Sequence, residues 1–315
     1  MSETSKTRID SKKPDHRLET IVRTEQIEPR TETVCLICET ENAPEALMCG
    51  ECFAPMALTR QAEALGRDPR IVSVIGESNV GKTVYLGFLL DMLSQRAGDF
   101  DAIPQGPYSV DLQQTVIGHM AQRVFPPKTP MEADQWYWAY YHVRRHRKNA
   151  PWIDLVMPDL AGESLASELS MPRTCRVISS LLNKSAGMML LVDAALAANG
   201  SAQPDFFSLK MLSYIDGLTI QPGGRRNSIP IAVLLCKADH CPECFDDPRA
   251  FVKTNLNRTW NLCESRFETV EVFASSVVGS LGYAMPADES YVRQVPLHTA
   301  LRGILEPFEW VVDRL

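Results

Sequence analysis

The 315-residue sequence has no apolar run long enough to cross a lipid bilayer. Its longest apolar stretch, Ala186 to Ala198, is too short for a transmembrane helix and is interrupted by Asp193. The sequence also lacks an early apolar run behind a basic start, which is the mark of a secretory signal peptide. These absences predict a soluble, cytoplasmic protein.

An excess of positive charge is missing as well. The formal net charge of −7 argues against a general nucleic-acid coat, although the run from His142 to Lys148 is locally basic. Such a run is usually solvated, so contact with nucleic acid, acidic lipid or an acidic partner is the less favoured interpretation. An apolar content of 45% is enough for a sizeable core, and the length fits one large domain plus a small module.

The nine cysteines include four in a metal-binding pattern. Cys35 and Cys38 form one CxxC pair, and Cys49 and Cys52 form a second pair ten residues later. This spacing brings four thiolates into one tetrahedral shell and predicts a structural Zn²⁺ site with no open position for catalysis. The segment is too small to bury a core, so the metal would supply most of its folding energy.

A glycine-rich loop is the clearest functional motif. It follows the apolar run Ile71 to Ile75, which reads as a strand, and it precedes an amphipathic segment, Val84 to Leu93. Strand, loop and helix are the context that a phosphate-binding loop requires, because the two glycines let backbone N–H groups turn toward phosphate oxygens. The lysine adds a point charge, and the threonine offers a hydroxyl to Mg²⁺. The loop reads Gly76-Glu77-Ser78-Asn79-Val80-Gly81-Lys82-Thr83.

Three further polar motifs follow predicted strands. Residues 152–157 lead to Asp159-Leu160-Ala161-Gly162, residues 229–235 lead to Cys236-Lys237-Ala238-Asp239, and residues 270–273 lead to Ala274-Ser275-Ser276. Strands that alternate with helices predict an α/β fold with a doubly wound, mostly parallel sheet. Ligands of such sheets bind at the carboxyl ends of the strands, where all of these motifs would lie.

In order and spacing, these four motifs resemble those of Ras-like GTPases of the translation-factor superclass, over roughly residues 68–315. Together with the N-terminal cysteine motif and the long segment before Asp159, they are similar to the bacterial double-GTPase group. Members of that group are thought to act with partner proteins in signalling or conflict systems. The resemblance therefore implies a GTP-binding switch that hydrolyses GTP.

The resemblance implies roles for the residues that contact the phosphates. Backbone N–H groups of Ser78 to Thr83 would cradle the phosphates, and Lys82 would reach the β and γ groups. Thr83 and, through water, Asp159 would hold Mg²⁺, while Gly162 would sense the γ-phosphate. The magnesium-binding threonine of the first switch has no sharp motif. Thr129 is our choice and Thr115 the second, with an ordinary loop threonine as the alternative.

It also implies how the base would be read. Asp239 would accept hydrogen bonds from the guanine N1 and amino groups, and the Lys237 stem would lie over the base. Backbone groups of Ser275 and Ser276 would contact the guanine carbonyl. The asparagine that usually precedes the lysine is Cys236 here, so a looser base pocket is expected.

Glu163 stands where a water-orienting glutamine often follows the glycine. A carboxylate there would repel the phosphate tail unless it is protonated or turned away, so we predict slow intrinsic hydrolysis, with a partner supplying an arginine finger. The alternative is a GTP-bound scaffold that does not hydrolyse its ligand. An ATPase, with Asp193 as the magnesium carboxylate, is less favoured because Ala194 rather than glutamate follows. Asp193 would otherwise cap the next segment.

Four segments are expected along the chain: a disordered polar tail (1–33), the zinc ribbon (34–57), a linker (58–69) and the GTPase domain (70–315). Within the last, residues 136–143 and 152–157 predict a hairpin whose aromatic side chains alternate between the core and an effector surface. Residues 164–184 and 205–217 predict helices, whereas residues 98–131 show weak periodicity. Residues 297–315 predict a closing helix kinked at Pro307. Cys241 and Cys244 are expected in a surface loop as unpaired thiols rather than as a second zinc site.

Overall fold

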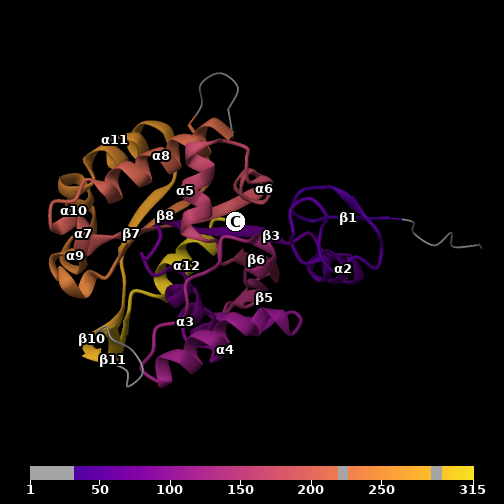
Figure 1. Cartoon of the computed structure of the whole chain (residues 1–315), viewed down its shortest axis with the longest axis horizontal. Coiled ribbons are helices and arrows are strands. Elements are labelled where there is room, and N and C mark those ends of the chain that lie inside the picture. Colours follow the sequence, from indigo (N-terminus) through magenta and orange to yellow (C-terminus); the bar gives the residue numbers. More distant parts are fainter. Residues whose placement is uncertain (1–31, 219–225, 285–292) are drawn as a thin grey trace, which may run out of the picture.

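The computed structural model describes residues 32–218, 226–284 and 293–315 (Figure 1). Its centre is a seven-stranded sheet in the order β4-β5-β6-β3-β7-β8-β9. Five neighbouring strands, β6 to β9 in that order, are parallel, and β5 and β4 continue the sheet as an antiparallel edge. The predicted α/β fold and the antiparallel β5–β6 hairpin are confirmed. The strands are β3 (Arg70–Gly76), β4 (Phe100–Pro104), β5 (Trp138–Arg145), β6 (Ile153–Pro158), β7 (Ser185–Asp193), β8 (Ile231–Cys236) and β9 (Val270–Ala274).

Helices cover both faces of this sheet because its strands are apolar on both sides. In β3, Val72 and Val74 face one apolar cluster, and Ile71 and Ile75 face the other. The first cluster contains α3 (Lys82–Ser94), α4 (Tyr108–Ala121) and α12 (Leu305–Val312). The second contains α5 (Gly162–Ser170), α6 (Arg176–Lys184), α8 (Gln203–Leu218), α10 (Pro248–Asn255) and α11 (Asn257–Arg266).

One helix prediction and one region without a predicted element need correction. The helix predicted over residues 164–184 is two helices, α5 and α6, with Pro172 between them. Proline lacks a backbone N–H, so it interrupts a helix interior. The region 98–131, which looked aperiodic, contains both β4 and α4. The remaining short helical segments are η1 (Ala133–Gln135), α7 (Ala194–Ala198), η3 (Ala238–His240) and α9 (Glu243–Asp246).

The predicted closing helix over residues 297–315 is wrong in its first part. Residues 297–302 belong to β11 (Arg293–Arg302), which pairs antiparallel with β10 (Ser276–Ala284) in a separate two-stranded sheet. The helix itself, α12, begins at Leu305, so Pro307 lies in its first turn. Backbone N–H groups in the first turn have no helical partner, and therefore this proline causes no kink.

The aromatic strand was predicted to be half exposed, and this is wrong. Trp136, Trp138, Tyr140 and Tyr141 are all buried, and Tyr137 is half-buried. Both faces of the antiparallel edge are covered, one by the cluster around α4 and the other by the cluster that includes the cysteine segment. These aromatics are therefore core residues, and the predicted effector surface is absent from this strand.

The basic run at the end of β5 is largely ion-paired. Arg144 and His146 contact Asp101 at 2.9 and 3.0 Å, and Arg145 pairs with Asp99 and Asp313. Three basic side chains of the run, Arg144, Arg145 and His146, are therefore already engaged by carboxylates within the protein.

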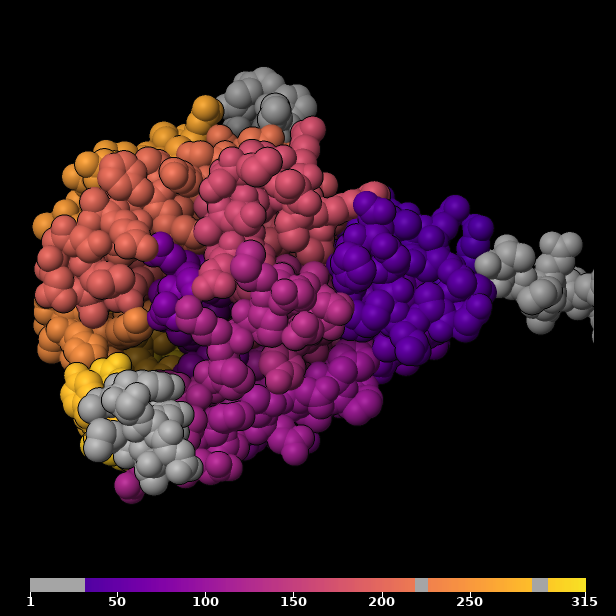
Figure 2. Space-filling view, viewed as in Figure 1, coloured from indigo at the N-terminus to yellow at the C-terminus, as the bar shows by residue number. Residues whose placement is uncertain are grey.

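The cysteine segment packs against the end of the sheet where β3 begins. It consists of β1 (Thr33–Val34), β2 (Glu41–Asn42) and two CxxC turns, followed by α2 (Met56–Leu65), which occupies much of the segment expected as a linker. The expected disordered tail lies outside the described residues except for 32–33, and Thr33 belongs to β1. Figure 2 shows this part, in indigo, projecting from one end of the molecule.

Two cations of α6 hold the cysteine segment in place. Lys184 Nζ lies 2.8 Å from Glu39 Oε1 and donates to the Leu36 carbonyl at 3.0 Å. Arg176 Nη1 lies 2.8 Å from Glu51 Oε1. The segment's buried residues join the same apolar cluster as the sheet face, so it packs as a continuation of the main core.

No helix within the described ranges combines the length and the apolarity that crossing a bilayer requires.

Candidate functional site

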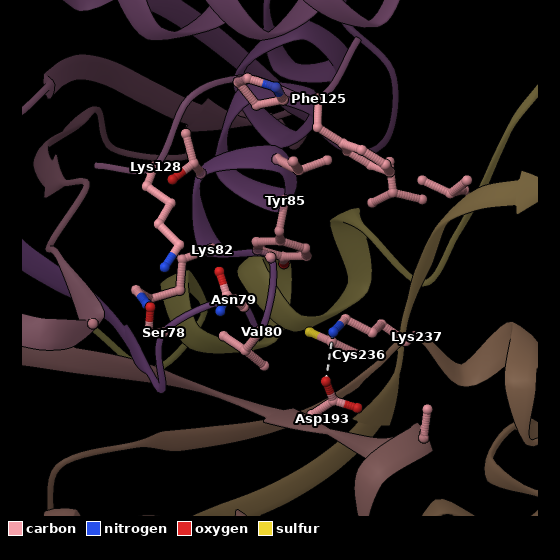
Figure 3. Close-up of a pocket in the computed structure, with 18 of the residues that line it drawn as sticks. Ser78, Asn79, Val80, Lys82, Tyr85, Phe125, Lys128, Asp193, Cys236 and Lys237 are labelled. Atoms are coloured by element: carbon pink, nitrogen blue, oxygen red, sulfur yellow. Dashed lines mark hydrogen bonds and ion pairs between the residues drawn. The ribbon is translucent and has the colours of Figure 1, made fainter. Parts of the chain in front are cut away.

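A cavity of about 570 Å³ opens at the carboxyl end of the sheet. All four motifs contribute to its wall, although they come from segments far apart in the sequence. Figure 3 shows the loop residues on one side and Lys237 with Asp193 on another. The predicted site residues that line it are Ser78, Asn79, Val80, Gly81, Lys82, Thr83, Thr129, Gly162, Glu163, Lys237, Asp239 and Ser275.

The glycine-rich loop links β3 to α3 with a left-handed backbone at two positions. Asn79 has φ 64° and Gly81, which precedes the first residue of α3, has φ 102°. The second conformation favours glycine because a side chain there is strained. Lys82 Nζ lies inside the loop and donates to the carbonyls of Gly76 and Glu77 at 3.0 and 2.8 Å. Burial lowers the pKa of Lys82 to about 8, although the Asp159 carboxylate opposes the shift.

Three oxygen-bearing side chains meet at the start of α3. Thr83 Oγ1 lies 2.9 Å from Thr129 Oγ1 and 3.0 Å from Asp159 Oδ2, and Thr129 Oγ1 donates to Asp159 Oδ2 at 2.8 Å. Asp159 is buried, and this burial raises its carboxyl pKa. Hydroxyl and carboxylate oxygens are the ligands that Mg²⁺ prefers, so the group fits that ion. Thr115, the second choice for the first switch, instead points to the Tyr137 hydroxyl at 3.4 Å.

Gly162 packs directly on the loop. A Cβ atom at this position would lie 2.4 Å from the Ser78 backbone nitrogen, so only glycine allows so close an approach. The next residue, Glu163, contacts the Ser78 hydroxyl at 3.4 Å and the Lys128 ammonium at 3.3 Å. The carboxylate that was expected to repel a phosphate tail is therefore paired with a cation.

Asp239 lies at another wall of the cavity and is oriented by two neighbours. Ser276 Oγ donates to Asp239 Oδ1 at 2.9 Å, and His240 Nε2 lies 3.5 Å from the other oxygen. The Ser275 backbone N–H donates to the Leu235 carbonyl at 2.8 Å, so this N–H is already engaged. Ser276 thus orients the carboxylate of Asp239 and does not itself line the cavity.

Asp193 caps the segment that follows it, as the alternative to a magnesium ligand predicted. Its carboxylate accepts from the Leu196 backbone N–H at 2.9 Å, at the start of α7. The other oxygen lies 2.5 Å from Lys237 Nζ, so the carboxylate contacts the lysine ammonium and not Thr83. Burial raises the pKa of the neighbouring Cys236 thiol to about 12, which keeps the thiol protonated near neutral pH.

Part of the cavity wall was not predicted from the sequence. Apolar residues come from the segment before Thr129 and from β10, for which the sequence predicted no element; its partner strand β11 includes residues 297–302, which were wrongly expected to be helical. The proline pair in the first segment was the one available signal. These residues are Phe125, Pro126, Pro127, Val277, Val278 and Leu281.

The four cysteines of the predicted zinc site form a second cluster. Sγ atoms of Cys35 and Cys52 lie 3.6 Å apart, those of Cys38 and Cys49 lie 3.5 Å apart, and all four are within 4.8 Å. Zn–S bonds of about 2.3 Å in a tetrahedron separate sulfurs by about 3.8 Å, so the cluster fits Zn²⁺. Asn42 Nδ2 adds a contact to Cys49 Sγ at 3.5 Å.

Cys241 and Cys244 do not lie in an exposed loop as predicted. Both are buried, with sulfurs 3.1 Å apart, because the turn after Asp239 folds inward. Among the described residues, the four-cysteine cluster is the one group of three or more candidate metal ligands.

The sequence around the cavity matches a known protein family. The model described as Double-GTPase 1 matches residues 73–237, which include the loop, Thr129, Asp159 and Lys237. This chain belongs to the Double-GTPase 1 family. Membership of the family indicates GTP binding by the P-loop fold. No curated protein matches the chain.

Among the solved structures similar to this double-GTPase are three of low sequence identity. The Arl6 (BBS3) small GTPase of Trypanosoma brucei, solved with the nucleotide analogue GppNp, is 13% identical, with 78% of this chain and 96% of that chain covered and a TM-score of 0.40. The signal recognition particle receptor SRb–GTP/SRX complex of Chaetomium thermophilum is 17% identical. The match covers 67% of this chain and 92% of that chain, with a TM-score of 0.34. The GTP-bound GTPase-like domain of Ski7 from S. cerevisiae is 17% identical. The match covers 64% of this chain and 42% of that chain, with a TM-score of 0.35.

Proposed function

We propose that this double-GTPase is a GTP-binding molecular switch that hydrolyses GTP slowly in the presence of Mg²⁺. The observation that carries the proposal is one cavity lined by both the phosphate loop around Lys82 and the base-reading candidate Asp239. Family membership supports GTP as the ligand. The switch would work in the cytoplasm, through partner proteins of a bacterial signalling or conflict system.

The loop residues bind the phosphates. Residues Ser78 to Thr83 line the cavity, and their backbone N–H groups would contact the phosphates. Lys82 exchanges its two carbonyl partners for β- and γ-phosphate oxygens. Thr83, Thr129 and Asp159 would hold Mg²⁺, which neutralises phosphate charge when it is bound. Thr129 and Gly162 would then report the γ-phosphate, because each lies in a segment anchored to the loop.

The other part of the cavity selects the base. Asp239 is a bidentate acceptor that matches the N1 and amino donors of guanine, and adenine offers no such pair of donors. The Ser276 hydroxyl holds one carboxylate oxygen, which reduces the freedom that binding would otherwise remove. Lys237 is fixed by Asp193, so its stem is held at the cavity wall.

Slow hydrolysis follows from the residue after Gly162. Glu163 is a carboxylate, and its contacts are Ser78 and Lys128. A partner that supplies an arginine finger would add positive charge in the transition state. Zn²⁺ in the four-cysteine cluster would stabilise a ribbon that recruits such a partner and has no catalytic position of its own.

Multiple-turnover hydrolysis assays with GTP and with ATP test the proposal. GTP turnover by the wild type, lost in Lys82→Ala, supports the switch. Tight GTP binding without turnover would favour the alternative of a GTP-bound scaffold, which the carboxylate of Glu163 makes the second candidate. A preference for ATP would contradict guanine recognition by Asp239.

A further inference from the structure

Lys128 reaches across the mouth of the phosphate site. Its ammonium lies 3.3 Å from Glu163 Oε1, and the same carboxylate oxygen accepts from the Ser78 hydroxyl at 3.4 Å. Figure 3 shows the Lys128 side chain extending toward Ser78 and Lys82 of the loop. Because Lys128 and Glu163 come from the two segments that flank the cavity, their pair joins these segments beside the loop.

The backbone around Lys128 is held in place. Pro126, Pro127 and Pro130 restrict the neighbouring φ angles, and Thr129 is tied by its hydroxyl to Thr83 and Asp159. A cation carried on such a segment needs little reorganisation to act on a charge that arrives beside it. Only the side chain of Lys128 has to move.

We propose that Lys128 is the cation that recognises the γ-phosphoryl group, exchanging Glu163 for γ-phosphate oxygens when GTP binds. This inference rests on the proposed function, since it concerns the same site. The ion pair is exposed, with 64% of the Lys128 side chain and 47% of the Glu163 side chain accessible, so it contributes little stability and is readily exchanged. GDP has no γ-phosphate, and with GDP bound Lys128 keeps Glu163 as its partner.

The exchange gives the two residues opposite effects on GTP. Lys82 already lies deep in the loop, so Lys128 supplies a second positive charge on the outer side of the phosphate tail. Glu163 opposes binding of that tail through charge repulsion, and its pairing with Lys128 reduces this effect. The GTP form therefore separates two side chains that the GDP form holds together.

Lys128 also acts in the reaction itself. During hydrolysis a bond forms between the water oxygen and the γ-phosphorus, and the bond from the γ-phosphorus to the β–γ bridging oxygen breaks. GDP leaves with the electron pair of that bond, and the proton of the attacking water passes to the released phosphate. Lys128 transfers no proton; its charge stabilises the equatorial γ-oxygens in the transition state.

The test compares the wild type with Lys128→Ala, Lys128→Arg and a matched control, Lys210→Ala, whose lysine is exposed on α8 outside the cavity. Affinities for GDP and for a non-hydrolysable GTP analogue are measured with Mg²⁺, together with single-turnover GTP hydrolysis. Lys128→Ala should lower the affinity for the analogue about 10-fold, while the affinity for GDP stays unchanged. Its single-turnover rate should fall by about 10- to 100-fold. Lys128→Arg and Lys210→Ala should stay close to the wild type.

Glu163→Gln supplies an independent readout that does not depend on catalysis. Removing its charge should raise the affinity for the GTP analogue about 3-fold or more and leave the affinity for GDP unchanged. Suppose that the wild type binds both nucleotides and that Lys128→Ala has the same ratio of analogue affinity to GDP affinity as the wild type. The inference then fails and the proposed function stands. A wild type that binds no guanine nucleotide overturns both.

Discussion

Thr129 Oγ1 lies 2.9 Å from Thr83 Oγ1, although 46 residues separate them in the chain. Both hydroxyls also contact Asp159, so segments from three parts of the chain converge on one carboxylate. Asp159 is buried, and a buried carboxylate needs such partners to offset its lost hydration. The loop and the segment that carries Thr129 are therefore linked by a common contact.

Replacing Thr129 tests whether this contact is a magnesium site. Thr129→Val keeps the shape but removes the hydroxyl, so it should raise the Mg²⁺ concentration needed for half-maximal GTP-analogue binding by about 10-fold. Thr129→Ser should restore the wild-type requirement. Thr115→Val is the matched control because Thr115 contacts Tyr137 and does not line the cavity. An unchanged magnesium requirement in Thr129→Val would remove Thr129 from the site.

The carboxylate of Asp239 should decide which base is bound. In Asp239→Asn one acceptor oxygen becomes an amide donor, which mismatches the guanine amino group but matches the 2-oxo group of xanthine. We expect GTP affinity to fall about 100-fold and affinity for xanthosine triphosphate to rise. Competition binding with both nucleotides measures this, and Asp246→Asn, an exposed residue of α9, is the control. Intact GTP selectivity in Asp239→Asn would mean that another group reads the base.

The local parts of this site could be predicted from the sequence. The run from β3 through Lys82 into α3 is continuous in the chain, so the apolar run and the glycines are enough to specify it. Thr129 has no local pattern, and its position was inferred only because the resemblance required a threonine before Asp159. Its place in the structure depends on how the chain between Thr83 and Thr129 folds.

Pairing between distant segments explains what the sequence did not predict. Residues 297–302 form a strand because β11 pairs with β10, and no helical or strand period of their own decides this. For the same reason the apolar wall at Val277 and Leu281 was missed. The aromatic residues of β5 follow the expected alternation, but alternation does not say whether the second face is covered, and here it is.

Zinc removal should destabilise more than the ribbon. Cys35 and Ile37 share a buried cluster with Trp138 and Tyr140 of the sheet, so unfolding the ribbon exposes apolar surface on the main domain. Cys49→Ala should abolish stoichiometric zinc, measured by elemental analysis, and lower the melting temperature by several degrees, about 4 °C or more. Cys263→Ala, at a buried cysteine outside the cluster, should keep its zinc. Full zinc in Cys49→Ala would show that the four cysteines do not act as one site.

Stability at acidic pH should depend on His142, a half-buried residue of β5. Its ring stacks on Trp152, with centroids 4.3 Å apart, and its Nδ1 lies 3.2 Å from Asp154 Oδ1 and 3.1 Å from Arg67 Nη1. Burial lowers the pKa of His142, and Asp154 opposes the shift without reversing it. The folded protein therefore favours the neutral ring, whereas the unfolded chain binds the proton at its ordinary pKa of about 6.5.

The sign of the effect follows from this difference in proton binding. Between the lowered pKa of His142 and its ordinary value, the unfolded state binds more protons, so the free energy of unfolding decreases as the pH falls through that window. His142→Gln removes the titration, and its melting temperature should approach that of the wild type, or exceed it, as the pH is lowered from about 7 to about 5. His298→Gln, at an exposed histidine of β11, is the control. The difference in melting temperature between wild type and His142→Gln could instead stay constant over this range. That result would show that burial of the ring does not control its protonation, because an uncharged contact to Trp152 does not depend on pH.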